Sequence, residues 1–195
     1  MISAVVLGAR GTERMAEQRS LLPLRDKPAL QWVLEAALTS NIHEVICVVP
    51  ELETVRRHIA LIEERLTWLV HCSAEGGQSS SFIAGLWAID PKSDGVLCLA
   101  GDQPFMQSDL IDALIERFEA GKALVVAASF HGQTRNPVIF RREVFPELLN
   151  LTGDRNGLAL LEKYRDKAEF IPWHDGTPFT DIGARADFGS LKEPA

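Results

Sequence analysis

An acidic side chain at the end of an apolar run is the strongest indication of chemistry in this sequence. Residues 95–100, Gly-Val-Leu-Cys-Leu-Ala, lead directly into Gly101-Asp102-Gln103-Pro104. A short apolar run with glycine or polar residues at both ends predicts a strand that is buried on both faces. Open α/β sheets bind ligands beyond the carboxyl ends of their strands, so Asp102 could hold a hard cation against substrate phosphates. Asp and Pro are also common turn residues, and this stretch alone leaves a turn and a metal site equally open.

A second group of residues has the character of an anion site. Residues 10–27 carry five cations against three anions, in a chain whose net charge is -7. The loop after the first apolar run contains Gly8 and Gly11, but it matches neither G-x-G-x-x-G nor the Walker pattern. Its backbone N–H groups, together with Arg14 and Arg19, could hold a polyphosphate. Arginines on a solvated loop are the alternative interpretation.

The elements that must position these residues follow from hydrophobic periodicity. We expect helices from Pro28 to about Ser40, from Pro50 through Leu66, over 79–90, and after a capping Ser108. The strands between them are expected at residues 2–7, 45–49, 68–72, 95–100 and 123–128. Single helices between successive strands imply right-handed crossovers. The expected fold is α/β, a Rossmann-like, mostly parallel sheet with helices on both faces.

The pattern changes after residue 130. An added strand is expected at 133–140, helices at 144–151 and 156–165, and short strands at 169–172 and 179–182. We interpret these elements as a cap on the same sheet. No repeat, low-complexity stretch or Ser/Gly-rich linker divides the sequence, so residues 1–195 are expected to form a single domain.

Composition narrows the class of protein. The 195 residues are 46% hydrophobic and 24% charged, which is typical of a soluble globular protein. A net charge of -7 argues against partnership with nucleic acid or anionic lipid. The apolar start is too short for a membrane span and lacks the basic region of a signal peptide, so we expect a cytoplasmic protein. Cys47, Cys72 and Cys98 are expected to be reduced core thiols, and the scattered histidines argue against a zinc site.

Several motifs together resemble one known family. Residues 7–24, L-G-A-R-G-T-E-R-M-A-E-Q-R-S-L-L-P-L, resemble the signature L-A-A-G-x-S-x-R-M-G-x-x-K-x-L-L-P-L of the molybdenum-cofactor nucleotidyltransferases. The nearest subgroup is the molybdopterin cytidylyltransferases. The similarity continues through residues 77–82 with Gly85-Leu86, and through residues 101–104, 136–140 and 151–155. The resemblance spans nearly the whole chain and implies a nucleotidyltransferase fold of the nucleotide-diphospho-sugar transferase type.

The resemblance also implies a reaction and a set of site residues. A nucleoside monophosphate would pass from an NTP, usually CTP in this subgroup, to the phosphate of molybdopterin, with Mg²⁺ as cofactor and release of pyrophosphate. Asp102, Arg14 and Arg19 would be catalytic, and Asp102 and Asp181 would bind the metal. The nucleotide would contact Leu7, Gly8, Ala9, Arg10, Gly11, Thr12, Arg14, Arg19, Ser79, Ser80 and Ser81. The acceptor would contact Arg135, Asn136, Pro137 and Asp154. Attack on an α-phosphate needs in-line positioning and neutralisation of spreading negative charge, which a metal and fixed cations supply.

Two of these assignments have structural alternatives. A run of serines before a helix can act simply as an N-cap, which would explain Ser79, Ser80 and Ser81 without a nucleotide. Asp154 in Thr-Gly-Asp could likewise be a helix cap. Family order favours the ligand-binding interpretation for the serines.

The sequence departs from the family pattern at several positions. Arg10 replaces the glycine of the signature, Ala16 its second glycine, Arg19 its lysine and Asp26 a later glycine, while Gly183 stands where a second acid is usual. Arginine keeps the charge of lysine but not its geometry. Two alternative functions therefore stay open. One is a non-catalytic relative that binds the cofactor or a molybdoenzyme as an insertion chaperone, which the altered loop favours. The other is a nucleotidyltransferase with a sugar phosphate acceptor.

Overall fold

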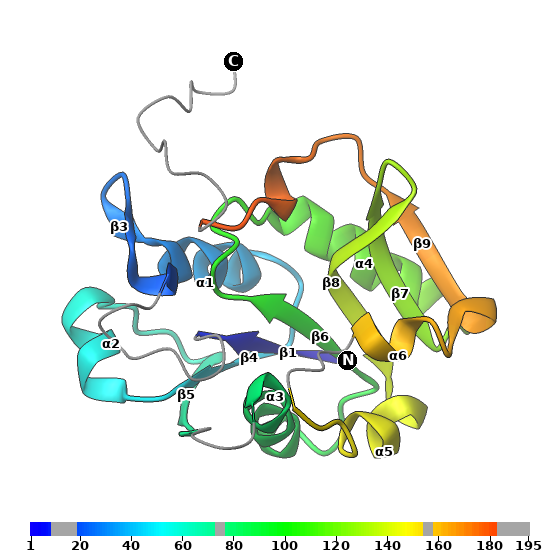
Figure 1. Cartoon of the computed structure of the whole chain (residues 1–195), viewed down its shortest axis with the longest axis horizontal. Coiled ribbons are helices and arrows are strands. Elements are labelled where there is room, and N and C mark those ends of the chain that lie inside the picture. The colour runs from blue at the N-terminus through cyan, green and yellow to red at the C-terminus, as the bar shows by residue number, and fades with distance from the viewer. Residues whose placement is uncertain (9–18, 73–76, 154–157, 183–195) are drawn as a thin grey trace.

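A seven-stranded sheet runs through the centre of the computed structural model, which describes residues 1–8, 19–72, 77–153 and 158–182 (Figure 1). The strand order is β5-β4-β1-β6-β8-β7-β9. The strands are β1 (Ile2–Leu7), β4 (Glu44–Val49), β5 (Leu66–Val70), β6 (Gly95–Ala100), β7 (Val125–Phe130), β8 (Gln133–Arg141) and β9 (Ala168–Pro172). β8 runs antiparallel to both of its neighbours, and the other pairs of this sheet are parallel. A small antiparallel pair, β2 (Pro23–Leu24) and β3 (Lys27–Pro28), stands apart. The predicted mostly parallel sheet is confirmed.

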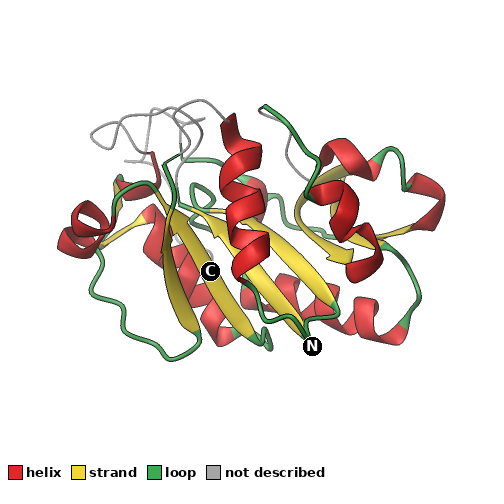
Figure 2. Ribbon diagram, turned by 90° about the horizontal axis from the view of Figure 1, so that it is seen from below, coloured by secondary structure: helices red, strands yellow, loops and turns green. Residues whose placement is uncertain are grey.

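Helices cover both faces of the sheet, as Figure 2 shows. On one face lie α1 (Ala29–Thr39) and α4 (Ser108–Ala120), and on the other α3 (Gly77–Ala88) and α5 (Phe145–Leu148). The remaining α-helices are α2 (Leu52–His58) and α6 (Leu158–Leu161), and the short 3-10 helices are η2 (Arg19–Leu21), η3 (Arg142–Val144), η4 (Arg165–Lys167) and η5 (Thr177–Phe179). Because side chains alternate along a strand, Ala4 and Val6 face the first layer and Val5 the second. In the part of the chain that is described, no helix has the length and apolar character needed to cross a membrane.

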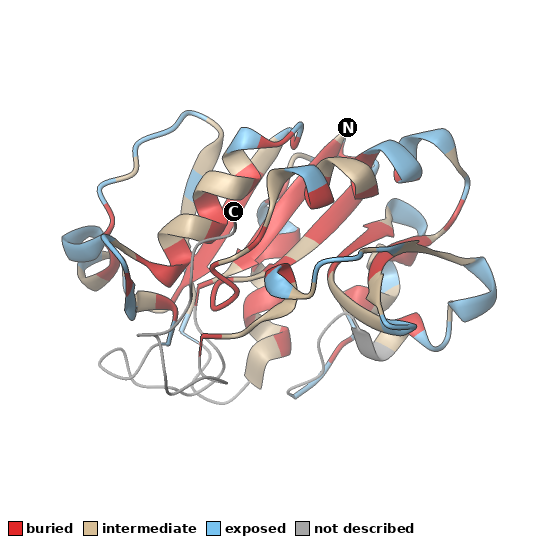
Figure 3. Ribbon diagram, turned by 90° about the horizontal axis from the view of Figure 1, so that it is seen from above, coloured by how far each residue is buried: buried red, intermediate tan, exposed pale blue. Residues whose placement is uncertain are grey.

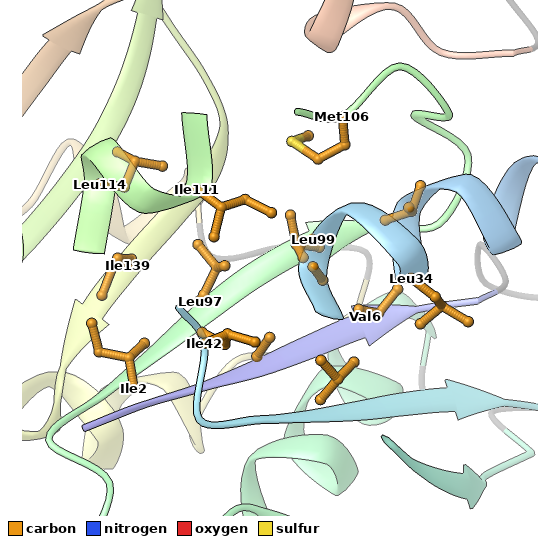
Figure 4. Packing of buried hydrophobic residues seen from close by; sticks show 14 of the residues in the cluster. Ile2, Val6, Leu34, Ile42, Leu97, Leu99, Met106, Ile111, Leu114 and Ile139 are labelled. Atoms are coloured by element: carbon orange, nitrogen blue, oxygen red, sulfur yellow. The ribbon is translucent and has the colours of Figure 1, made fainter. Parts of the chain in front are cut away.

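The buried residues are concentrated on the central strands (Figure 3). Leu97 and Leu99 of β6 point toward the side of the sheet that holds Ile111 of α4 and Leu34 of α1 (Figure 4). Each such side chain contributes about 1.5–3 kcal/mol when it is fully buried. β6 is covered on both faces, as its apolar run predicted, and it ends directly before Asp102.

The second helix is much shorter than predicted, since α2 spans Leu52–His58 and not Pro50 through Leu66. α2 ends at His58, where the backbone of Ile59 becomes extended, and Ile62 is 97% exposed. Leu66 belongs to β5, which starts two residues earlier than predicted and pairs with Val45 of β4. The helical spacing from Val55 to Leu66 is misleading for two reasons. Ile59 is buried in the core although it lies in a non-helical segment, and Leu66 is a strand residue that packs against the core from β5.

Other boundaries also differ from the predictions. Ser108 is the first residue of α4 and not its cap, and Pro28 precedes α1 as its N-cap residue. The helix expected over 144–151 is divided into η3 and α5, and α6 is shorter than expected over its described residues. Residues 179–182 form no strand, since η5 ends at Phe179 and the following residues pair with no neighbouring strand.

The three cysteines have different environments. Cys47 is buried in the core, Cys98 is half-buried and Cys72 is exposed, and all three are free thiols. Burial raises the pKa of the Cys47 and Cys98 thiols above the ordinary value, because the thiolate loses its hydration. The prediction of core thiols is therefore wrong for Cys72, which follows the end of the edge strand β5.

Candidate functional site

The candidate site is built at the carboxyl edge of the sheet, where β1 and β6 end side by side. The N–H of Gly101 donates to the carbonyl of Leu7 over 2.9 Å, and the N–H of Gly8 donates to Val48 over 2.9 Å. The parallel register pairs Leu7 with Ala100, so the residues that follow both strands leave the sheet at the same place. The signature loop and the Gly-Asp-Gln-Pro turn thus begin next to each other.

Glycine is required at Gly101 by this close approach. A methyl group there would lie 2.7 Å from the Leu7 carbonyl oxygen, 2.8 Å from Leu30 Cδ1 and 3.2 Å from Gly8 Cα. The first two contacts are shorter than real Cβ atoms tolerate, and the shortest is to a backbone oxygen. The absence of a side chain therefore lets the turn after β6 lie against Gly8, and this contact fixes the main-chain position of the next residue, Asp102.

Asp102 is buried and lies beside a segment from the far end of the chain. Asp102 is 3% exposed, and its backbone carbonyl accepts a hydrogen bond of 2.8 Å from the N–H of Ile182. The side-chain amide of Gln103 donates to Asp181 Oδ1 over 2.9 Å. Figure 1 shows this segment, in red, returning from β9 toward the end of β6. The structure thus brings together the two residues that were predicted as metal ligands.

The donor set suits a small, hard cation. Asp102 and Asp181 offer carboxylate oxygens, which are the ligands that Mg²⁺ prefers. The described residues contain no cluster of three or more His, Cys, Asp or Glu side chains of metal-binding arrangement. Two carboxylates fit Mg²⁺ well, since this ion usually keeps several waters and binds one or two carboxylates plus substrate phosphates.

The three predicted nucleotide-binding serines lie in the first turns of α3. Ser79 and Ser81 are buried, and the hydroxyl of Ser80 donates to the Gly77 carbonyl over 3.0 Å. α3 begins at Gly77, so these serines lie inside the helix and the capping alternative does not apply to them. The N–H of Ser79 donates to the carbonyl of Gly153 over 3.1 Å, which brings Gly153 to the first turn of this helix.

Three of the four predicted acceptor-binding residues, Arg135, Asn136 and Pro137, lie in the first half of β8. Val138 pairs with Ala127 but Arg135 pairs with Ala128, so Asn136 and Pro137 form a bulge, with a cis peptide bond between them. Val138 also pairs with Cys98 of β6 in antiparallel register, which places the preceding residues toward the Asp102 edge of the sheet. The Arg135 guanidinium donates to Gln133 Oε1 over 2.7 Å.

Part of the predicted site lies outside the described residues, namely Ala9, Arg10, Gly11, Thr12, Arg14 and Asp154. Arg19 is exposed at the start of η2, and the hydroxyl of its neighbour Ser20 donates to the Gly8 carbonyl. The roles of Ser20 and Gln103 were not predicted. Gln103 lies inside the Gly-Asp-Gln-Pro motif, which was the available signal, whereas nothing in the sequence marked Ser20.

Comparison with known proteins identifies the class. Residues 4–168 match the model of the MobA-like NTP transferase domain, and the chain belongs to this family of nucleotidyltransferases. The family predicted from the motifs is therefore confirmed.

Individual relatives carry different names. The chain is 28% identical over 165 residues to the purine catabolism protein PucB of Bacillus subtilis, covering 81% of this chain and 79% of that protein. It is 30% identical over 123 residues to 3-deoxy-manno-octulosonate cytidylyltransferase of Synechococcus elongatus, covering 62% of this chain and 48% of that protein. A probable molybdenum cofactor guanylyltransferase of Natranaerobius thermophilus is 28% identical over 125 residues, covering 62% and 57%.

Solved structures share the fold. Rv0371c of Mycobacterium tuberculosis superposes with a TM-score of 0.77 at 24% identity, covering 89% of this chain and 88% of that chain. A manganese complex of Rv0371c gives 0.73 at 23% identity, covering 89% and 88%. CMP:2-keto-3-deoxy-manno-octonic acid synthetase complexed with CTP gives 0.70 at 14% identity, covering 94% and 94%. The predicted nucleotidyltransferase fold is confirmed.

Proposed function

We propose that this protein transfers a cytidylyl group from CTP to the phosphate of molybdopterin, with Mg²⁺ as cofactor and release of pyrophosphate. The observation that carries the proposal is the pairing of Asp102 with the Asp181 segment, directly beside Gly8 at the carboxyl edge of the sheet. In a family of NTP transferases, this edge is where a triphosphate and a cation would meet.

Different residues of this chain would bind the metal ion, the triphosphate and the nucleoside. Asp102 and Asp181 would hold Mg²⁺, which when bound supplies positive charge to the phosphates. Leu7 to Thr12, with Arg14 and Arg19, would bind the triphosphate through backbone N–H groups and guanidinium groups. Ser79, Ser80 and Ser81 would contact the nucleoside. Burial of Asp102 strengthens its attraction for a cation, because water screens the interaction less there.

The acceptor would approach from the β8 side. An oxygen of its phosphate attacks the α-phosphorus of CTP, and the bond to the bridging oxygen of the β-phosphate breaks as pyrophosphate leaves. Arg135, Asn136 and Pro137, with Asp154, would orient the acceptor for this in-line displacement. The positive guanidinium of Arg135 suits an acceptor that carries a phosphate.

The choice of substrates has separate support. The motif resemblance is nearest to molybdopterin cytidylyltransferases, and one relative is named a probable molybdenum cofactor guanylyltransferase. A sugar-derived acceptor is the second candidate, because other relatives are named 3-deoxy-manno-octulosonate cytidylyltransferase and 2-C-methyl-D-erythritol 4-phosphate cytidylyltransferase. A molybdoenzyme that receives the product would be a further partner.

The test is pyrophosphate release from CTP, GTP, ATP and UTP, each with Mg²⁺ and with molybdopterin, 3-deoxy-manno-octulosonate or 2-C-methyl-D-erythritol 4-phosphate. We expect the highest kcat/KM for CTP with molybdopterin. Faster turnover with either of the other acceptors would establish the second candidate instead. No release from any pair, together with capture of molybdopterin or a molybdoenzyme in a pull-down, would establish the non-catalytic chaperone.

A further inference from the structure

Gln103 has an unusual hydrogen-bonding position in the candidate site. It is 7% exposed and follows Asp102 directly, and its Nε2 lies 2.9 Å from Asp181 Oδ1. An ionised carboxylate only accepts hydrogen bonds, so the N–H side of the amide must face Asp181. Gln103 Oε1 is buried and has no hydrogen-bond partner among the residues that the structure describes. The orientation of this amide is therefore set by Asp181 and not by a bond on its other side.

The backbone of the Asp181 segment is held by its neighbour. Ile182 is 2% exposed and packs in a cluster with Leu24 and Ala29, and its N–H donates to the Asp102 carbonyl over 2.8 Å. These contacts fix where the main chain passes, whereas the direction of the Asp181 carboxylate also depends on the torsions of its side chain. The contact from Gln103 acts on that side chain directly.

The chemistry of an amide suits this task better than a cation would. Two carboxylates that share a divalent cation repel each other in its absence, and the bound cation relieves that repulsion. A lysine or arginine in place of Gln103 would neutralise Asp181 and compete with the cation. The neutral amide donates one hydrogen bond and leaves the negative charge of the pair in place.

We propose that Gln103 is a positioning residue that aims the Asp181 carboxylate toward a divalent cation shared with Asp102. This inference rests on the cation site of the proposed function, and it assigns Gln103 a role that acts through Asp181. The partners of metal ligands typically change metal affinity by about 10–100-fold when they are removed.

Gln107, four residues further along the chain and just before α4, provides a matched control. Its Nε2 donates to Asp175 Oδ2 over 3.1 Å, so it makes the same type of bond to an aspartate. That bond is exposed, and the Asp175 side chain also accepts from Thr177. Gln107→Met therefore removes a Gln–Asp hydrogen bond without touching Asp102 or Asp181.

The experiment measures Mn²⁺ binding by electron paramagnetic resonance, with no nucleotide present. The variants are Gln103→Met, Gln107→Met, Asp181→Asn and the double variant Gln103→Met/Asp181→Asn. We expect Gln103→Met to raise the Mn²⁺ Kd by about tenfold or more, and Gln107→Met to leave it unchanged. Because Gln103 acts through Asp181, the double variant should bind Mn²⁺ no more weakly than Asp181→Asn alone.

Wild-type affinity in Gln103→Met, or additive losses in the double variant, would overturn the inference. If Gln103→Met does not fold, Asp181→Asn decides alone, since unchanged Mn²⁺ affinity there would remove the ligand that Gln103 is meant to position. A wild-type protein that binds no Mn²⁺ overturns both this inference and the cation site. A wild-type protein that binds Mn²⁺ with the expected variant pattern but releases no pyrophosphate overturns only the proposed reaction.

Discussion

At the level of single residues, the site depends on two glycines whose lack of a side chain allows close packing of the backbone. Gly101 and Gly8 let two strand ends touch, and the buried Asp102 follows at once. Asp102 therefore has a main-chain position that depends on the contact of its neighbour with Leu7, in addition to its own side-chain interactions.

Gly101→Ala should lower the free energy of unfolding by about 1–3 kcal/mol, because its methyl group would press on the Leu7 carbonyl at 2.7 Å. Urea denaturation measures this change. Gly121→Ala is the control, since a methyl group there meets its nearest neighbour, the Arg117 carbonyl, at 3.3 Å and outside the site. Equal effects of the two substitutions would contradict the close-approach account.

The position of Asp102 could be predicted from sequence because a buried strand and its end are both marked locally, by an apolar run and by Gly-Asp-Gln-Pro. The bond from Gln103 to Asp181 could not, since a contact between residues so far apart in the chain leaves no periodic pattern. Asp181 itself was found through the family resemblance and not through its spacing.

At the scale of elements, local periodicity predicted the central strands and α1, α3 and α4 well, because their apolar positions are also their core positions. Local periodicity gave wrong predictions where apolar residues enter the core from segments that are neither helix nor strand. Ile59 extends the helical spacing of α2 although the helix has ended. The alternating residues 179–182 resemble a strand, but Ile182 packs against Leu24 of the β2-β3 pair and Ala29 of α1 instead of pairing in the seven-stranded sheet.

The bulge at the start of β8 leads to a prediction about the acceptor. Arg135→Ala should raise the KM for molybdopterin by about tenfold or more and leave the KM for CTP unchanged, because a charged contact to phosphate is lost on the acceptor side only. Initial-rate kinetics with each substrate varied separately measure both constants. Arg165→Ala is the control, as it removes an exposed arginine paired with Glu162 on a different segment. A rise in the KM for CTP alone would place Arg135 at the nucleotide instead.

At the scale of the whole molecule, the class of fold was predictable but the order of the strands was not. The alternation of strands and helices favours parallel pairing, because a helix between two strands returns the chain to the same end of the sheet, and such crossovers are right-handed. Nothing local shows that β8 inserts between β6 and β7 in the antiparallel sense, which carries residues 135–137 to the Asp102 edge. Gly8 likewise lies so close to the Val48 carbonyl that a side chain would be crowded there, and this contact exists only because β1 and β4 pair.

The reactivity of the three thiols tests whether the core is packed as described. In the native protein a thiol reagent at neutral pH should modify Cys72 rapidly, whereas Cys47 and Cys98 react slowly because burial raises their pKa and suppresses the thiolate. All three should react rapidly in denaturant. The colour change of a disulfide reagent measures the kinetics, and Cys72→Ser removes the rapid phase if the assignment is correct. Rapid native reaction of Cys47 would contradict the buried β4 core.

The role of Asp102 in metal-dependent catalysis is tested most directly by comparing wild type with Asp102→Asn in pyrophosphate release from CTP and molybdopterin, with Mg²⁺ varied. Asparagine keeps the size of the side chain but loses the charge that a divalent cation needs. We expect a cooperative thermal transition in both proteins, Mg²⁺-dependent turnover in wild type and a loss of turnover of at least about a hundredfold in Asp102→Asn. Equal rates in the two proteins, or wild-type turnover that needs no divalent cation, would contradict it.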